Sequence, residues 1–217
     1  MDVAGTVNDA EAVGVILAGG RALRLGGGDK CQLLLDGKTL LRWVVDAARP
    51  QVVRLMLNAN GRSQRFAAEQ LPVRADVVAG YAGPLAGILT GMVWAREQVP
   101  GTDWLLSLAA DTPFLPPDLA QRLMQRARQE QAQIVLAASG DRVHPVIGLW
   151  HCALRDDLSR ALQEEGVRTV MQWVERYRWS AVDISADDSN ASGPDPFFNI
   201  NRPEDLETAR ALCRRTR

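Results

Sequence analysis

Glycines and cations are concentrated in one short stretch of the sequence, residues 19 to 30. The glycines are Gly19, Gly20, Gly26, Gly27 and Gly28, and the cations are Arg21, Arg24 and Lys30. Glycine backbones adopt angles that other residues avoid, so successive N–H groups can converge on an anion. Arginine adds a planar fork that fits two phosphate oxygens, and lysine adds a point charge. The stretch therefore predicts a phosphate-binding loop, with a plain surface turn as the alternative.

The two common phosphate-loop patterns do not fit this stretch. A Walker loop needs Ser or Thr directly after its lysine, but Lys30 is followed by Cys31. A dinucleotide fingerprint that starts at Gly26 needs glycine or alanine where Cys31 stands, and one that starts at Gly20 needs a glycine two residues later. The loop therefore belongs to another class of phosphate-binding protein.

Apolar segments with polar residues at their ends surround this loop. The run Val13 to Leu17 has the length and β-branched content of a buried strand and leads into the loop. Asn58 follows the apolar segment 52–57, and Asp111 follows the segment 104–109. Strands that alternate with helices are typical of a Rossmann-like three-layer α/β/α fold with a mostly parallel central sheet. Because such sheets bind ligands beyond the carboxyl ends of their strands, one cleft can collect these residues.

The remaining elements follow from periodicity and turn signals. We expect strands at residues 13–17, 52–57, 73–78, 104–109, 134–137, 146–150, 179–184 and 197–201. We expect helices at residues 40–48 and 63–70, from the 83–87 turn to Gln98, from Pro116 to about Glu130, at 154–163 and 169–177, and from Pro203 onward. Residues 1–12 are interpreted as a disordered lead-in, residues 13–217 as a single domain, and residues 185–196 as a mobile loop.

Composition excludes several function classes. A formal net charge of -1 gives no general attraction to nucleic acid or to membranes. No apolar run approaches the roughly 20 residues needed to span a bilayer, and the first twelve residues lack the features of a signal peptide. The cysteines Cys31, Cys152 and Cys213 are odd in number and widely spaced, which indicates neither disulfides nor a zinc site. A cytoplasmic location fits best.

Asp111 is a candidate metal ligand. Magnesium in proteins is typically held by one or two carboxylates together with substrate phosphates. An aspartate at the end of a strand, beside a phosphate loop, supplies the carboxylate that the loop lacks. The alternative is that Asp111 only caps the turn before Pro113, which aspartate often does.

The whole pattern resembles that of the molybdenum cofactor guanylyltransferases, whose signature is LAGG-x-x-x-R-M-G-x-x-D-K. The matching residues are Leu17, Ala18, Gly19, Gly20, Arg24, Gly26, Asp29 and Lys30. Leu25 stands where methionine is usual, a volume-conserving change. The segment Asp111-Thr112-Pro113 is similar to the Asp-x-Pro motif of related transferases, and the resemblance extends from Val13 to Leu212.

The resemblance implies a nucleotidyltransferase fold with a GTP site in the N-terminal half. The residues implied to bind GTP are Leu17, Ala18, Gly19, Gly20, Arg24, Lys30, Asn58, Asp76, Gly83, Gly87 and Asp111. Arg24, Lys30 and Asp111 are expected to be catalytic, and Asp111 is expected to bind Mg²⁺. Guanine has two adjacent donors on its Watson–Crick edge, and Asp76, eighteen residues after Asn58 as in the family, can accept from both. Either residue alone is equally explained as turn chemistry.

The C-terminal half is implied to hold the acceptor, a molybdopterin. The family carries a His-Pro and an Asn-x-Asn-x-Pro segment in this half, which His144, Asn199 and Asn201 match. A lone histidine or paired asparagines are otherwise more often structural. The tryptophans are assigned to the core, with Trp150 or Trp173 as candidates to stack on a pterin.

The implied reaction transfers GMP from GTP to Mo-molybdopterin and releases pyrophosphate. Two alternatives stay open. One is a sister enzyme, such as a molybdenum cofactor cytidylyltransferase or another sugar or cofactor nucleotidyltransferase. The other is a non-catalytic nucleotide-binding module that delivers cofactor. Molybdoenzymes or their chaperones are the expected protein partners, and no nucleic acid or membrane is expected.

Overall fold

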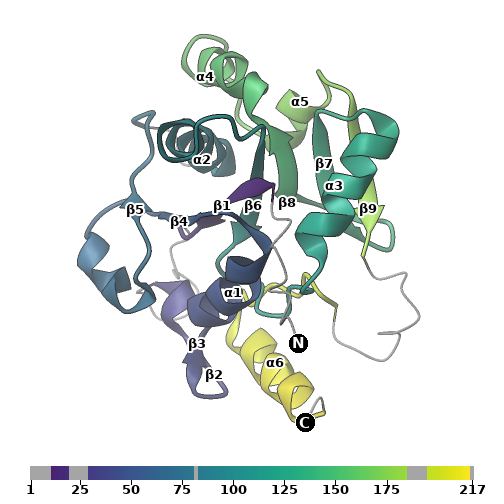
Figure 1. The fold of residues 1–217 in the computed structure, drawn as a ribbon. Helices are drawn as coiled ribbons and strands as arrows, with labels where there is room; N and C mark the ends of the chain where they lie inside the picture. The colour runs from purple at the N-terminus through teal and green to yellow at the C-terminus, as the bar shows by residue number, and fades with distance from the viewer. Residues whose placement is uncertain (1–10, 20–28, 81–82, 185–194, 216–217) are drawn as a thin grey trace, which may run out of the picture.

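A central seven-stranded sheet organises the chain in the computed structural model, which describes residues 11–19, 29–80, 83–184 and 195–215 (Figure 1). The strand order is β5-β4-β1-β6-β8-β7-β9. The strands are β1 Ala12–Leu17, β4 Leu55–Asn58, β5 Val73–Arg74, β6 Trp104–Ala109, β7 Ile134–Ser139, β8 Arg142–His151 and β9 Trp179–Asp183. Only β8 runs antiparallel to its neighbours β6 and β7. The predicted mostly parallel α/β sheet is confirmed.

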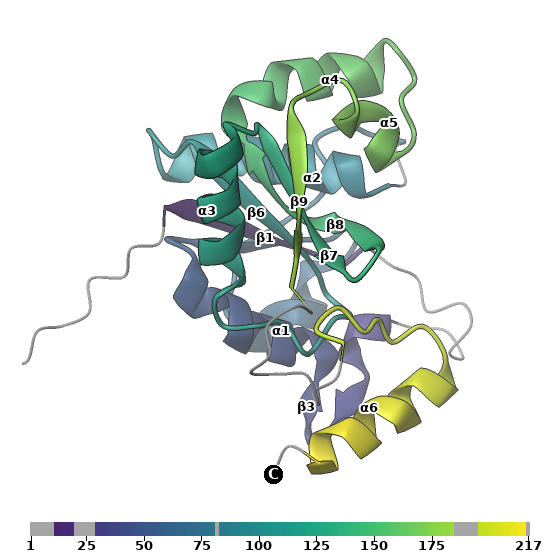
Figure 2. The same cartoon turned by 90° about the vertical axis from the view of Figure 1, so that its right-hand side faces the viewer.

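Helices cover both faces of this sheet, so its strands are buried on both sides (Figure 2). The helices are α1 Leu40–Ala48, α2 Pro84–Gln98, α3 Leu119–Glu130, α4 Arg155–Gln163, α5 Val170–Val174 and α6 Pro203–Arg215. In β1, Ile16 packs with α1 and α3, whereas Val13 and Val15 pack with α2, α4 and α5. This alternation follows from the two-residue period of a strand and gives three layers.

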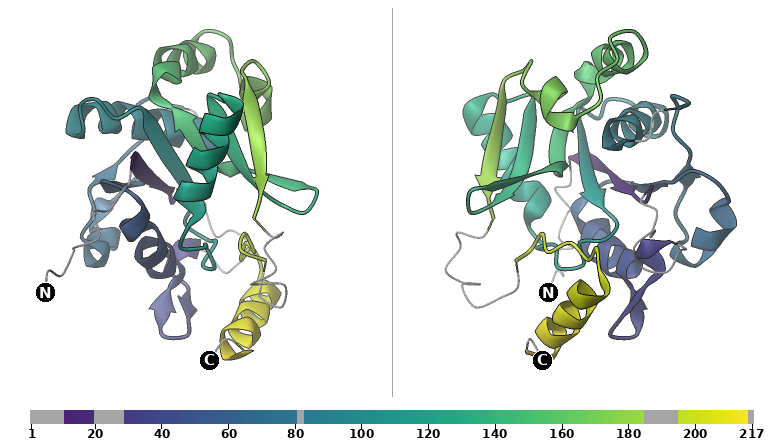
Figure 3. Two further views of the ribbon diagram at one scale, coloured as in Figure 1. Left: turned by 45° about the vertical axis from the view of Figure 1, so that its right-hand side comes forward. Right: turned by 180° about the vertical axis from the view of Figure 1, so that it is seen from behind.

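Helix α6 lies apart from these layers, against a small hairpin of β2 Leu34–Leu35 and β3 Lys38–Thr39 (Figure 3). Leu35 and Leu40 pack with Ile200, Ala209 and Cys213 in a separate hydrophobic cluster. This cluster fixes the C-terminal segment beside the segment that follows the glycine-rich loop. Two segments far apart in the sequence are thereby brought together.

Several element boundaries match their sequence predictions. Helix α1 covers the predicted residues, and the Thr39 hydroxyl caps it by accepting a hydrogen bond from the Arg42 N–H at 3.0 Å. Strand β6 also has its predicted bounds. Of the predicted lead-in 1–12 and the predicted loop 185–196, residues 1–10 and 185–194 lie outside the described residues. The lead-in prediction is wrong at Ala12, which is buried and begins β1.

Other predicted elements are corrected. Residues 63–69 form a 3₁₀ helix, η3 (Ser63–Glu69), and further single 3₁₀ turns are η1 (Lys30–Gln32), η2 (Arg49–Gln51) and η4 (Cys152–Leu154). Strand β5 ends at Arg74 because the next residues bond to side chains instead of a neighbouring strand. Residues 197–201 form no strand, since the Phe198 N–H bonds within a turn and the Ile200 N–H bonds to the Asp111 carbonyl.

No helix in the described part of the chain combines the length and the apolar character that crossing a membrane requires.

A polar cluster joins α4 to α5 and gives a pH-dependent prediction. The Trp173 indole N–H and the Tyr177 hydroxyl both donate to the Asp157 carboxylate, which also pairs with Arg160. Burial alone would raise the pKa of Asp157, but these hydrogen bonds and charges outweigh it and lower the pKa. A carboxyl group whose pKa is lower in the folded than in the unfolded protein stabilises the fold at pH values above its unfolded-state pKa. This stabilisation is lost as the pH falls through the pKa of the folded state.

We therefore expect Asp157→Asn to lower the free energy of unfolding by about 1 kcal/mol at pH 7. Urea denaturation at neutral pH and near pH 3 measures the free energy of unfolding of both proteins. The difference between Asp157→Asn and wild type should be smaller at the lower pH. Asp156→Asn is the matched control, because the Asp156 side chain is 81% exposed and pairs with the adjacent Arg155 on the surface. A gap of equal size at both pH values would contradict the assignment.

Candidate active site

The carboxyl ends of three neighbouring strands are tied together at one edge of the sheet. The Ala18 N–H donates to the Asn58 carbonyl at 2.9 Å, and the Ala110 N–H donates to the Leu17 carbonyl at 3.2 Å. Strand β1 therefore ends between β4 and β6, as the register of its pairs also shows. The predicted residues Leu17, Ala18, Asn58 and Asp111 thus share one site, and Gly19 continues from β1 into it.

Lys30 lies at the centre of this site. Its ammonium donates to Asp111 Oδ2 at 2.5 Å, to Asn199 Oδ1 at 3.0 Å and to Asn201 Oδ1 at 2.5 Å. An ammonium has three donors, and these three acceptors use all of them. Lys30 and Asp111 are largely buried, with side chains 10% and 20% exposed. One cation therefore joins the end of the phosphate loop, the end of β6 and the C-terminal segment.

The second carboxylate oxygen of Asp111 fits a metal ligand. Asp111 Oδ1 is buried and has no hydrogen-bond partner among the described residues. A buried unpaired carboxylate oxygen is costly, which favours a cation at this position when substrate is bound. The described residues contain no group of three or more His, Cys, Asp or Glu side chains that could hold a metal by themselves. The site therefore suits a divalent ion that completes its shell with phosphate oxygens.

A second polar group lies at the ends of β4 and β5. The Asn58 amide donates to Asp76 Oδ1 at 2.9 Å and to the Arg74 carbonyl at 3.2 Å. The next N–H along the chain, that of Val77, donates to the buried Thr90 hydroxyl on α2 at 3.0 Å. The predicted pair Asn58 and Asp76 is therefore in direct contact, and both residues are fixed against α2.

Gly87 is required by the position of the Asn58 side chain. A Cβ atom on Gly87 would lie 2.4 Å from Asn58 Oδ1 and 2.6 Å from Leu17 Cδ2. Gly83 differs, because a Cβ there would meet, among the described residues, only the Arg168 carbonyl, at 3.9 Å. Gly83 is the N-cap of α2, and its exposed position leaves room for a ligand near the helix N-terminus, where negative charge is favoured.

We expect Gly87→Ala to weaken GTP binding at least about tenfold, because the added methyl group displaces the Asn58 amide from Asp76. Gly91→Ala is the matched control in the same helix, since its Cβ would press on the core residues Leu105 and Val15 instead. Both variants should lose thermal stability, but only Gly87→Ala should lose affinity in equilibrium titration with GTP. Equal affinity losses in the two variants would show that Gly87 acts only through stability.

His144 lies further along the sheet, on β8. Its Nε2 atom is 2.7 Å from the Ser139 hydroxyl, and its ring packs on Phe197 with a centroid distance of 4.7 Å. Burial lowers the pKa of His144, which favours a neutral ring. In the described residues no hydrogen bond joins it to Lys30, but Phe197 connects it to the segment that carries Asn199. His144 therefore borders the C-terminal side of the site.

Some predicted residues do not reach the site, and others cannot be placed. Trp150 and Trp173 are fully buried and stack on each other, so the prediction that either stacks on a pterin is wrong. Gly20 and Arg24 lie outside the described residues. Cys31, next to Lys30, is buried, and burial together with the Asp29 charge raises the pKa of its thiol to about 12, which disfavours the thiolate form.

Two polar residues at the site were missed by the sequence analysis. Asn60 bonds to Asp76 through both its amide nitrogen and its amide oxygen. Arg65 pairs with Asp29 at 3.1 Å and donates to the Asn60 carbonyl at 2.6 Å. The repeated asparagine in Asn58-Ala59-Asn60 was the available signal, since residues two apart on an extended segment share a face.

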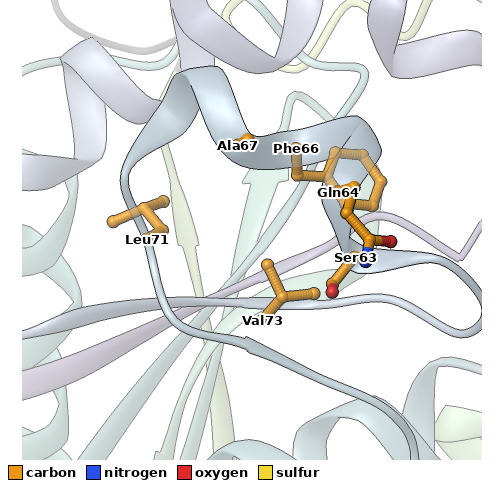
Figure 4. Close-up of a pocket in the computed structure, with 6 residues that line it drawn as sticks. All are labelled: Ser63, Gln64, Phe66, Ala67, Leu71 and Val73. Carbon is orange, nitrogen blue, oxygen red and sulfur yellow. The ribbon is translucent and has the colours of Figure 1, made fainter.

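An open hollow beside η3 and β5 is a separate feature (Figure 4). Its lining residues are Ser63, Gln64, Phe66, Ala67, Leu71 and Val73. None of these side chains is charged, so the hollow lacks the cations that a phosphate group requires.

A mostly parallel α/β sheet, a glycine-rich sequence that ends in Lys30 and a carboxylate after the end of β6 together fit the nucleotidyltransferase class. The sequence matches the family model described as MobA-like NTP transferase domain over residues 14–179. The chain belongs to this family. The fold and the family predicted from the sequence are both confirmed.

Individual relatives agree with this assignment. The chain is 45% identical over 208 residues to a molybdenum cofactor guanylyltransferase of Nitrobacter hamburgensis, covering 96% of this chain and 97% of the relative. Its fold is similar to that of molybdopterin-guanine dinucleotide biosynthesis protein A from Archaeoglobus fulgidus, with a TM-score of 0.74 at 22% identity, covering 94% and 99% of the two chains. A Mycobacterium tuberculosis protein in complex with manganese gives a TM-score of 0.64 at 20% identity, covering 92% and 98%.

Proposed function

We propose that this chain transfers GMP from GTP to the terminal phosphate of Mo-molybdopterin and releases pyrophosphate, as a molybdenum cofactor guanylyltransferase. Its relative of 45% identity carries this name, and the two chains match over nearly their whole lengths. The observation that carries the proposal is the Lys30 cluster, because one ammonium contacts the metal-site carboxylate Asp111 and the acceptor-side residues Asn199 and Asn201. In the proposed reaction, Lys30 would lie between the two substrates that must meet.

On the nucleotide side, the amides that follow Leu17 and the positive N-terminus of α2 would bind phosphate or sugar oxygens. Gly20 and Arg24 belong to the same loop and would complete the contacts to the triphosphate. Asp111 would hold Mg²⁺ through Oδ1, and the manganese complex of a neighbour with the same fold supports a divalent ion. A bound Mg²⁺ neutralises charge and orients the triphosphate.

The chemistry needs no general base, because the attacking phosphate is already an anion. Its oxygen forms a bond to the α-phosphorus of GTP in line, while the bond from that phosphorus to the bridging oxygen breaks and pyrophosphate leaves. Lys30 would shift from Asn199 and Asn201 to the phosphate oxygens, where negative charge develops. The main contributions of the protein are thus positioning and charge stabilisation.

Guanine would be recognised by Asp76. Each oxygen of a carboxylate has two acceptor positions, and the protein occupies one on each oxygen through Asn58 and Asn60. One position on each oxygen is left for the two adjacent donors of guanine. Cytosine and adenine do not offer such a pair, so this arrangement supports GTP over CTP and ATP.

The acceptor would lie on the C-terminal side, between His144 and the segment of Asn199 and Asn201. Residues 13–217 would then act as one domain with a GTP-binding half and a molybdopterin-binding half. We place the enzyme in the cytoplasm, with molybdoenzymes or their chaperones as its protein partners.

The proposal is tested by a pyrophosphate-release assay with each of the four nucleoside triphosphates, with and without Mo-molybdopterin, in Mg²⁺. Release only with GTP and only with the acceptor is expected. Release with CTP would instead indicate a cytidylyltransferase. Tight GTP binding without pyrophosphate release would indicate a delivery module, and either result would overturn the proposal.

A further inference from the structure

Asn60 makes an unusually complete set of contacts for an exposed residue. Its Nδ2 donates to Asp76 Oδ2 at 2.8 Å, and its Oδ1 accepts from the Asp76 N–H at 2.9 Å. Its carbonyl accepts from the Arg65 guanidinium at 2.6 Å. Asn60 therefore binds both the backbone and the side chain of Asp76 and is itself anchored at its backbone.

The two amides around Asp76 determine how its carboxylate is turned. Asn58 donates to Oδ1 from the buried side, and Asn60 donates to Oδ2 from the exposed side. Rotation of a carboxylate about its last bond moves both oxygens, so it breaks two hydrogen bonds when both oxygens are held and one when only one is held. Two hydrogen bonds therefore restrain the orientation more strongly. The direction of the two remaining acceptor positions is thus fixed before any base arrives.

We propose that Asn60 is a specificity-determining positioning residue, which holds the Asp76 carboxylate in the one orientation that accepts from both donors of a guanine base. This inference rests on the proposed function, in which Asp76 reads guanine. Asn60 itself need not touch the nucleotide, since it acts through Asp76. Preorganisation of this kind raises selectivity because the site does not have to order itself upon binding.

Inosine triphosphate is the probe that isolates this effect. It keeps the ring N–H of guanine but lacks the exocyclic amino group, so it can satisfy only one of the two acceptor positions. Wild-type protein should prefer GTP over ITP by about 10- to 100-fold in dissociation constant, because one hydrogen bond to a charged acceptor is lost. The measurement uses the full chain with Mg²⁺ and either nucleotide, without acceptor.

Asn60→Asp is the sharpest variant because it changes one contact only. The new side chain has the same shape and can still accept from the Asp76 N–H, but it cannot donate to Asp76 Oδ2 and repels it. We expect the preference for GTP over ITP to fall at least about fivefold. Gln64→Glu is the matched control, since it adds the same charge at an exposed position on η3 outside the site, and it should keep the wild-type preference.

A structural role for Asn60 makes a different prediction. If Asn60 only shapes the turn through the Asp76 N–H, Asn60→Asp should keep the wild-type GTP to ITP ratio, even if both affinities change. That result would overturn the inference. In an Asp76→Ala background, Asn60→Asp should change the ratio no further, and a second, additive loss would also overturn it.

The test separates this inference from the proposed function. A protein that prefers GTP to ITP but releases no pyrophosphate in the presence of Mo-molybdopterin would contradict the proposed reaction. The ratios of GTP to ITP affinity would still decide the role of Asn60. A wild-type protein without any preference for GTP over ITP would overturn the inference itself.

Discussion

Asp111→Asn is expected to lower kcat at least about 100-fold while GTP binding changes far less. The variant keeps the size of the side chain and its hydrogen-bonding oxygen, but it removes the charge that would hold Mg²⁺ at the buried Oδ1. In the proposed function, GTP would also gain binding energy from contacts with Asp76, which this change does not touch. Steady-state pyrophosphate release and equilibrium GTP titration measure the two effects separately.

Asp118→Asn is the control for this variant. Asp118 follows on the same segment, at the start of α3, and its side chain makes no capping hydrogen bond to the helix. Its replacement should leave turnover within about twofold of wild type, as is usual for a substitution away from special contacts. Near-normal turnover of Asp111→Asn in excess Mg²⁺ would remove Asp111 from the catalytic residues.

Lys30→Ala is expected to reduce kcat by about 100-fold or more, because it removes the positive charge that the proposed function places on the departing pyrophosphate. The substitution also leaves Asp111, Asn199 and Asn201 without their shared donor. Lys30→Arg should recover little activity, since a planar guanidinium cannot point three donors at three separate acceptors as an ammonium does. Pyrophosphate release at saturating GTP and acceptor measures both variants.

The chain offers an unusually clean control here, because its only other lysine is Lys38. Lys38 is half exposed and pairs with Asp46 on the surface at 2.8 Å. Lys38→Ala should therefore keep wild-type turnover and lose little stability. A Lys30→Ala variant that turns over as fast as Lys38→Ala would show that Lys30 only links the segments.

The residues at strand ends were predictable from the sequence, for local reasons. An apolar run followed by Asp111 is sufficient to place that carboxylate at the carboxyl end of β6, and the same holds for Asn58 at the end of β4. Thr39 likewise marks the start of α1, because a hydroxyl at this position satisfies a backbone N–H. Such signals depend only on neighbouring residues.

The convergence on Lys30 was not predictable in this way. Asn199 and Asn201 lie 169 and 171 positions after Lys30, and they reach it because α6 packs on the β2–β3 hairpin. They were expected on a strand, with both side chains on one face. They instead lie on an irregular segment in which Ile200, between them, donates its N–H to the Asp111 carbonyl. Residue periodicity does not encode such a long-range contact.

The central claim is that Asp111 and Lys30 bind the same metal-bound triphosphate, Asp111 through the metal ion and Lys30 through a phosphate oxygen. The most direct test is a crystal structure with a non-hydrolysable GTP analogue and Mn²⁺, whose anomalous scattering locates the ion. We predict the ion within about 2.3 Å of a carboxylate oxygen of Asp111, bridged to the phosphates, with the Lys30 ammonium on a phosphate oxygen. An analogue whose phosphates bind away from both residues, with the ion held elsewhere, would contradict the account.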